Sequence, residues 1–164
     1  MSKTRRLVIS ALFATLVCIL TMIIKIPSPL FNGYLNFGDS IVLVAGWMLS
    51  PLFAFLSASI GSFLADIFSG YMLYAPVTLV IKGSMALCAH YVYKFSIKKM
   101  GDIPSKTISA VLAEIIMVGG YYIFEGFLYG FIPSLINAYA NVAQGIFGIV
   151  LGIFIVKVFK KIIQ

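Results

Sequence analysis

Charged and amide side chains stand inside otherwise apolar runs of this sequence, where they could hold a small polar molecule. They are Asp66, Lys82, Glu114, Glu125, Asn137, Asn141 and Gln144. A charged group near the middle of a bilayer costs roughly 2.5–3.5 kcal/mol on insertion scales, so it persists where it is paired or functional. The three amides follow i, i+4, i+7 and share one helical face. Three amides on one face exceed what holding two helices together needs, so we interpret the face as a cavity wall.

Catalytic arrangements are absent from the sequence. It has no glycine-rich phosphate loop followed by Lys-Ser/Thr, and its His, Cys and Asp residues do not cluster at metal-ligand spacing. The single histidine, His90, lies near the inner end of an apolar run, away from the other polar groups. We therefore expect a chain that is not an enzyme and that binds no cofactor or metal.

The elements that carry these residues must be membrane helices. The 164 residues are 62% hydrophobic and 10% charged, with a mean hydropathy of +1.08, whereas soluble domains are about 45–50% apolar and about 25% charged. Only helices and closed barrels span lipid, and these apolar runs are too long and continuous for barrel strands. We predict one all-α integral membrane domain over residues 1–164.

Five apolar stretches are long enough to cross a bilayer, which takes ~20 residues. They lie at residues 5–25, 39–68, 76–94, 107–129 and 134–158. The second is ambiguous, because its thirty residues could form one tilted helix or two elements joined at "MLSPLF". Ser50-Pro51 favours two, since Ser is a good N-cap and Pro suits the first helical position.

Basic residues decide between these readings. The net charge is +7, and the Lys and Arg residues flank the apolar runs in three clusters, before the first run, after residue 94 and at the C-terminus. Such clusters are topology signals that favour the cytoplasmic side, so we expect no nucleic-acid partner. All three lie on one side only if residues 39–68 cross twice. We predict six spans with cytoplasmic termini; a re-entrant hairpin over 39–68 has the same parity and remains open.

The polar groups of the later spans are predicted to lie at a common depth. At 1.5 Å per residue, Lys82, Tyr121, Glu125 and Asn141 lie about 7–12 Å below the outer helix ends, whereas Glu114 is much deeper. These groups could line a cavity. The alternative is structural: Asp66 and Lys82 would form a buried ion pair, and the amides would join the last helix to its neighbours.

The loop over residues 26–38 is the longest one on the predicted outer side. Its prolines and glycines predict an irregular conformation. Asp39 follows it and has the residue type of an N-cap, which would satisfy free helix N–H groups. The functional interpretation is a lid made of Phe31, Tyr34, Asn36 and Phe37, with Asp39 fixing its hinge and Asp66 supporting the structure below.

Small residues recur at four-residue spacing on two helices. Ser10 and Ala14, and likewise Ala11 and Thr15, form such pairs in the first run, and Ser57, Gly61 and Ala65 follow the same spacing in the third predicted span, within residues 39–68. Small-xxx-small patterns let helices approach closely in lipid. The first-run pattern serves either internal packing or docking of another membrane protein.

Two stretches carry a resemblance to a known family. "LNFGDSIVLVAG" follows the outer loop, and "GSFLADIFSGYMLYAPVTLVIKG" runs from the third span into the fourth. With six spans in a chain of this length, the sequence resembles the S components of energy-coupling factor (ECF) vitamin transporters. The resemblance points to the branch with riboflavin-type proteins and proteins assigned to hydroxymethylpyrimidine or pyridoxine.

The resemblance implies where a ligand would bind. In that family the first outer loop caps a site formed with the last three helices, which here gives a cap of Tyr34, Asn36 and Phe37. The walls would be Lys82, Tyr121, Glu125, Asn137 and Asn141, and Gln144 extends the same amide face. The family also docks a small-residue stripe of its first helix onto a transmembrane T subunit, which here corresponds to Ser10, Ala11, Ala14 and Thr15.

The implied function is binding of a vitamin or vitamin precursor outside a bacterial plasma membrane. A hydroxymethylpyrimidine or pyridoxine-like ligand is favoured, and riboflavin is possible. Uptake would use the T subunit and two partner ATPases, which hydrolyse the ATP. Two alternatives remain: a self-sufficient transporter or channel, and a membrane enzyme that uses Glu114 or Glu125.

Overall fold

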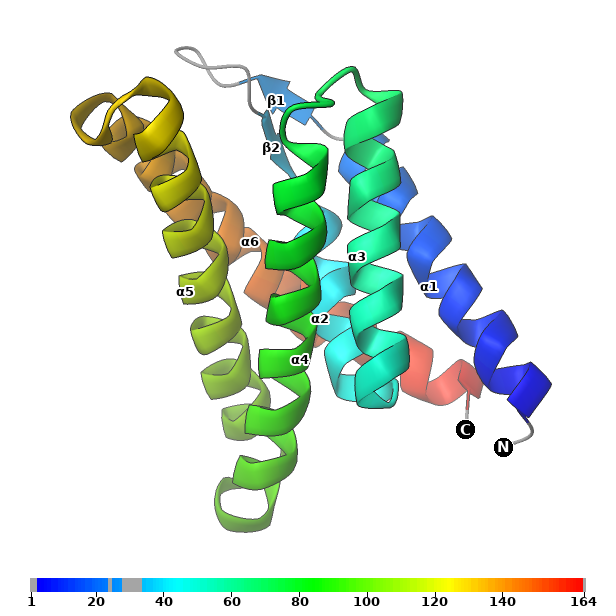
Figure 1. Cartoon of the computed structure of the whole chain (residues 1–164). Coiled ribbons are helices and arrows are strands. Elements are labelled where there is room, and N and C mark those ends of the chain that lie inside the picture. Colours follow the sequence, from blue (N-terminus) through cyan, green and yellow to red (C-terminus); the bar gives the residue numbers. More distant parts are fainter. Residues whose placement is uncertain (1–2, 24, 28–33, 164) are drawn as a thin grey trace.

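The apolar runs form helices, and a short two-stranded ribbon joins the first two of them (Figure 1). The computed structural model describes residues 3–23, 25–27 and 34–163. In this part of the chain the elements are α1 (Lys3–Ile23), β1 (Lys25–Pro27), β2 (Tyr34–Asn36), α2 (Gly38–Met48), α3 (Pro51–Phe68), α4 (Ala75–Met100), α5 (Asp102–Tyr129) and α6 (Phe131–Ile163). Five helices are long and apolar enough to cross a membrane, and α2, with 11 residues, is shorter. The all-α prediction is confirmed.

The stretch over residues 39–68 is two elements rather than one long helix. The chain turns after α2, and α3 begins at Pro51, with Ser50 in the N-cap position (φ −70°, ψ 157°). The Ser50 side chain makes no capping hydrogen bond. The break therefore comes from the extended backbone before a proline, which disfavours helical geometry, rather than from the serine hydroxyl.

The two chain termini lie at the same end of the bundle as the turn between α4 and α5 (Figure 1). That turn is made by Gly101 alone, at φ 81°, where a residue without a Cβ is least strained. The ribbon and the α3–α4 and α5–α6 turns lie at the opposite end. The termini and the Gly101 turn must lie at one end if the chain crosses the membrane an even number of times between the basic clusters. That this end faces the cytoplasm stays a prediction.

The outer loop is more regular than expected. β1 and β2 pair antiparallel, with Lys25 opposite Asn36, Ile26 opposite Leu35, and Pro27 opposite Tyr34. The prediction of an irregular segment at Pro27 was wrong, because a proline is tolerated at the end of a ribbon whose strands each have a free edge. The expectations for Pro29, Phe31 and Gly33 lie outside the described residues.

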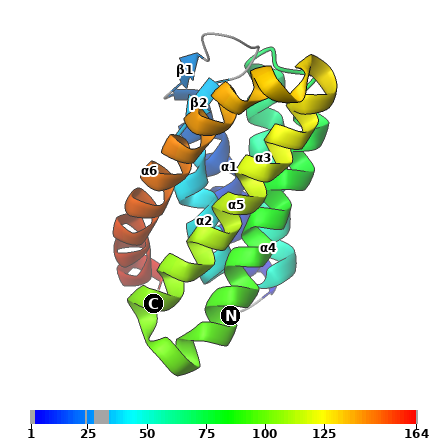
Figure 2. The ribbon, with the colours of Figure 1, turned by 90° about the vertical axis from the view of Figure 1, so that its left-hand side faces the viewer.

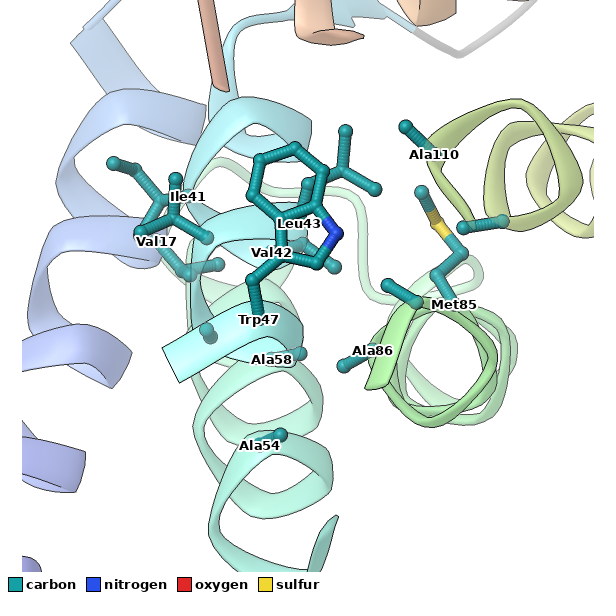
Figure 3. Packing of buried hydrophobic residues seen from close by; sticks show 14 of the residues in the cluster. Val17, Ile41, Val42, Leu43, Trp47, Ala54, Ala58, Met85, Ala86 and Ala110 are labelled. Atoms are coloured by element: carbon teal, nitrogen blue, oxygen red, sulfur yellow. The ribbon is translucent and has the colours of Figure 1, made fainter. Parts of the chain in front are cut away.

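The core is built around α2. Every residue from Gly38 to Trp47 is buried, because α1, α3, α4 and α6 all contact this helix. Figures 1 and 2 show α5 and α6 meeting at one end of the bundle, and Figure 1 shows them separating toward the other. Figure 3 shows Ile41, Val42 and Leu43 of α2 among side chains from the neighbouring helices. A helix that is apolar all round must be buried, and α2 is buried by the other helices of the bundle.

Candidate ligand-binding site

A buried ion pair lies at the centre of the bundle, between Asp39 of α2 and Lys82 of α4. Asp39 is 0% exposed and Lys82 is 3% exposed. The second carboxylate oxygen of Asp39 accepts a hydrogen bond from Nε2 of Gln144 on α6. Both oxygens of Asp39 are thus satisfied by side chains from two other helices, which offsets the cost of burying the charge.

Two expectations for these charges were wrong. Asp39 is not the N-cap of α2; Phe37 holds that position, and its side chain makes no capping hydrogen bond. The Asp39 carboxylate lies in the first turn and meets the ammonium instead. The ion pair expected for Lys82 with Asp66 is formed with Asp39, while Asp66 is buried near the C-terminal end of α3.

The strand β2 is tied to this centre through Gln144. The Asn36 backbone N–H donates to Oε1 of Gln144 over 2.8 Å, and the Asn36 side chain accepts from the Gly38 N–H over 2.9 Å. The Phe37 ring lies 6.2 Å from the ring of Phe147 on α6, centroid to centroid. Asn36 and Phe37 therefore both contact α6, while their role as a cap over a ligand stays a prediction. The side chain of Tyr34 is outside the described part.

A second polar group surrounds Glu125 of α5. Its Oε1 accepts from Nδ2 of Asn137 over 2.7 Å and from the Tyr74 hydroxyl over 3.3 Å. Its Oε2 is buried and has no hydrogen-bond partner among the described residues. Burial, with a further contribution from Glu125, raises the pKa of the Tyr74 hydroxyl, so it remains a neutral donor.

Tyr121 lies next to members of both polar groups, and its ring is 6.5 Å from the ring of Tyr74, centroid to centroid. Its hydroxyl shares a 2.9 Å hydrogen bond with Oγ1 of Thr78, and the Lys82 ammonium lies 5.5 Å from the centre of its ring. Tyr74 and Thr78 escaped the sequence analysis. Their spacing could have identified them, because residues 74, 78 and 82 follow i, i+4, i+8 from the N-cap of α4 into the helix and lie on one side of it.

The amide face of α6 points inward as predicted. Asn137, Asn141 and Gln144 are 5%, 9% and 5% exposed, and the outer two belong to the Glu125 and Asp39 groups respectively. Asn141 lies one turn from each, between the two groups. The face thus spans the polar interior from one group to the other.

Glu114 lies beside the central pair and not apart from it. A Cβ on Gly148 of α6 would be 3.0 Å from Cβ of Asp39 and 3.1 Å from Oε1 of Glu114, so both acidic residues lie against the same glycine. Neither carboxylate oxygen of Glu114 has a hydrogen-bond partner in the described part of the chain. No group of three His, Cys, Asp or Glu that could hold a metal is found there either.

The small-residue stripe of α1 divides between two faces. Ser57 of α3 donates a 2.8 Å hydrogen bond to the Ser10 carbonyl, and a Cβ on Gly61 would lie 2.4 Å from the Ala14 carbonyl oxygen. Ser10 and Ala14 therefore pack inside the bundle. Ala11 and Thr15 lie on the exposed face of α1, where a partner could reach them.

Comparison with known proteins gives a consistent result. The family model described as "ECF-type riboflavin transporter, S component" matches residues 1–161. A Pyrococcus woesei protein described as "Uncharacterized protein in gap 3'region" is 34% identical over 145 residues, which cover 88% of this chain and 95% of that protein. The "Thiamine precursor transporter HmpT" of Lactococcus lactis subsp. cremoris (strain MG1363) is 26% identical over 161 residues, covering 98% and 88%.

Two solved structures share the fold. The S component of a bacterial ECF transporter superposes with a TM-score of 0.79 at 23% identity and covers 99% of each chain. The S component for biotin from an ECF-type ABC transporter gives a TM-score of 0.69 at 15% identity, covering 98% of this chain and 95% of that one. At these identities the likeness concerns the arrangement of helices, and the ligand has to be argued from the site.

Proposed function

Because the chain belongs to the family of S components of ECF-type riboflavin transporters, we propose that it captures a hydroxymethylpyrimidine- or pyridoxine-like vitamin precursor from outside the cell. The observation that carries the proposal is the meeting of polar groups from α2, α4, α5 and α6 beneath β2, which Gln144 ties down. The likeness to a thiamine precursor transporter supports this ligand class. Riboflavin is the second candidate, because the matching family carries its name.

The free hydrogen-bonding capacity of the site fits a small heteroaromatic ring with donor groups. Oε2 of Glu125 is buried and can accept from an amino or hydroxymethyl group. The Lys82 ammonium has three N–H donors, and Asp39 does not use all of them. The amide of Asn141 faces the same interior. The rings of Tyr121 and Phe37 supply stacking faces for a planar ligand.

Transport would need partners. This chain would bind the ligand, and we propose that a transmembrane T subunit and two ATPases drive its transport. ATP would be bound by those ATPases and not by this chain. The exposed pair Ala11 and Thr15 on α1 is the proposed docking face, because small side chains let a partner helix approach closely. Both termini and the Gly101 turn would then face the cytoplasm, consistent with their basic neighbours.

Ligand retention tests the proposal. The protein is purified in detergent, co-purified small molecules are identified by mass spectrometry, and hydroxymethylpyrimidine, pyridoxine and riboflavin are each titrated by calorimetry. We expect N141A and E125A to weaken binding about 10–100-fold, the loss expected when a hydrogen bond to a charged or buried group is removed. T107A, which changes an exposed residue of α5, is the matched control and should bind like the wild type.

Two outcomes would contradict the proposal. Unchanged binding in both N141A and E125A would refute the site. Uptake into liposomes that contain this chain alone would favour the alternative of a self-sufficient transporter, since an S component needs its ATPase partners. Retention in detergent without uptake by the isolated chain is the result we expect.

A further inference from the structure

One face of α4 gathers three lysines and two aromatic side chains near the turn to α5. Tyr91, Lys94, Phe95, Lys98 and Lys99 follow i, i+3, i+4, i+7 and i+8, so they share one side of the helix. They line a hollow of about 590 Å³, and all five side chains are exposed. We refer to these five residues as the basic patch.

The positive charge of the basic patch is not balanced by the chain itself. The sequence has five acidic residues, and four of them are buried. The fifth, Asp102, accepts hydrogen bonds from Nζ of Lys106 over 2.5 Å and from the Tyr93 hydroxyl over 2.6 Å. The three lysines of the patch form no ion pair among the described residues. The patch therefore attracts an anion from outside the chain.

The length of α4 places the patch at a membrane surface. The helix has 26 residues, about 39 Å at 1.5 Å per residue, whereas the hydrocarbon core is ~30 Å thick. Lys94 is the twentieth residue of the helix, so it lies at one boundary of the core when Ala75 lies at the other. Figures 1 and 2 show the α4–α5 turn extending beyond the ends of α1 and α6. The last turns of α4 therefore reach the level of lipid headgroups.

The aromatic and basic members of the patch lie at different depths. Tyr91, which is 57% exposed, lies about one turn on the core side of Lys94, and Lys98 and Lys99 lie about one turn on the other side. The Lys99 ammonium is 4.9 Å from the centre of the Phe95 ring, an attraction that holds the cation over the patch. Rings at the level of acyl chains and ammonium groups at the level of phosphates complement a whole phospholipid. A soluble anion or an acidic protein segment outside the membrane would contact only the lysines.

We propose that the basic patch is a binding site for an anionic phospholipid. The phosphate accepts hydrogen bonds from the ammonium groups of Lys94, Lys98 and Lys99, which carry three N–H donors each. An acyl chain lies against Tyr91 and Phe95. This site is separate from the vitamin precursor site, because it lies at the opposite end of the bundle from the β-ribbon and uses none of the residues assigned to that ligand.

Native mass spectrometry of the purified protein tests the site. The probes are phosphatidylglycerol and phosphatidylcholine with identical acyl chains, titrated in detergent micelles without vitamin. Each lysine near an anionic headgroup contributes about fivefold to binding, so we expect the first phosphatidylglycerol to bind at least about tenfold more tightly than phosphatidylcholine. The triple variant K94Q/K98Q/K99Q should lose this preference and should bind phosphatidylcholine as the wild type does.

K157Q is the matched control. Lys157 is exposed at the same end of the bundle, on α6, and its ammonium lies 5.7 Å from the centre of the Phe154 ring. The variant removes the lysine of a lysine–aromatic pair outside the patch, and it is compared with K99Q, which removes one inside the patch. We expect K99Q to weaken phosphatidylglycerol binding about fivefold and K157Q to leave it within about twofold of the wild type.

The proposal is overturned if the triple variant keeps the preference for phosphatidylglycerol, or if K157Q weakens binding as much as K99Q does, since net charge alone would then explain it. It is also overturned if glycerol 3-phosphate, the soluble counterpart of the headgroup, displaces phosphatidylglycerol at equal concentration, because the acyl contacts would then contribute nothing. A monodisperse size-exclusion profile for each variant shows that it is folded. Failure of vitamin binding would leave these outcomes unaffected, so the two proposals fail separately.

Discussion

The ion pair between Asp39 and Lys82 allows a quantitative test of what holds the centre of the bundle together. Both side chains are less than 5% exposed, so water cannot compensate either charge when its partner is removed. Breaking a buried pair by removing one partner costs about 3–5 kcal/mol, whereas replacing both partners by neutral groups that fit is often close to neutral. We therefore compare K82Q, D39N and the double variant D39N/K82Q.

The single variants each leave one uncompensated charge. K82Q leaves the Asp39 carboxylate with only amide donors, one of them Gln144, and D39N leaves a buried ammonium facing an amide. We expect each to lower the free energy of unfolding by about 3–5 kcal/mol. At this chain length, 1 kcal/mol shifts Tm by roughly 2–4 °C, so the expected loss is about 6–20 °C.

The double variant restores a neutral pair. The amide oxygen at position 39 can still accept from Gln144, and its NH₂ can donate to the glutamine at position 82. We expect D39N/K82Q to lie within about 1 kcal/mol of the wild type, which gives a coupling energy of several kcal/mol in the double-mutant cycle. Thermal unfolding in detergent without ligand, followed by circular dichroism, measures all four proteins.

Additive losses in the double variant would refute the reasoning. They would mean that each side chain is stabilised by separate neighbours and that the pair contributes little by itself. S84A, at a half-buried position on α4 two residues from Lys82, controls for a general sensitivity of that helix and should change Tm by only a few degrees.

Two further predictions concern the cap and the helix packing. Q144A removes the acceptor for the Asn36 N–H of β2 and one donor to the Asp39 carboxylate. We expect faster amide hydrogen exchange at Asn36 and a free energy of unfolding lower by about 1–3 kcal/mol. Unchanged exchange would contradict the role of Gln144 in holding β2. G61A places a Cβ 2.4 Å from the Ala14 carbonyl oxygen and should destabilise the protein by about 1–3 kcal/mol. G119A places its Cβ in open space and should stabilise the protein by about 0.5–1 kcal/mol. Equal Tm values for the two variants would contradict the close contact of α1 and α3.

Local signals in the sequence predicted the helices well. Ser50-Pro51 separates α2 from α3 because the constraint that proline places on the residue before it is local. The inward orientation of Asn137, Asn141 and Gln144 followed from their spacing alone, since helical periodicity fixes which residues share a face. These features needed no knowledge of the neighbouring helices.

The choice of partners could not be predicted in the same way. The sequence analysis offered only Asp66 as an ion-pair partner for Lys82, and the pairing with Asp39 instead depends on how α2 lies against α4. Hydrophobicity likewise does not distinguish a helix covered by protein from one covered by lipid, so the burial of α2 was not visible in its composition. The pairing of Pro27 with Tyr34 joins two residues only seven apart, in a segment whose residue types favour irregular structure.

The enclosure of α2 also bears on the order in which the chain assembles. This helix is synthesised second, yet α4 and α6, which cover much of it, leave the ribosome later. Before α4 and α6 are synthesised, the apolar side chains of α2 can be covered by lipid. The Asp39 carboxylate, however, can then form neither its ion pair with Lys82 nor its hydrogen bond with Gln144. A nascent chain stalled before residue 144 should therefore still lack the hydrogen bond from Gln144 to Asp39, and α2 should reach its final packing only when α6 is complete.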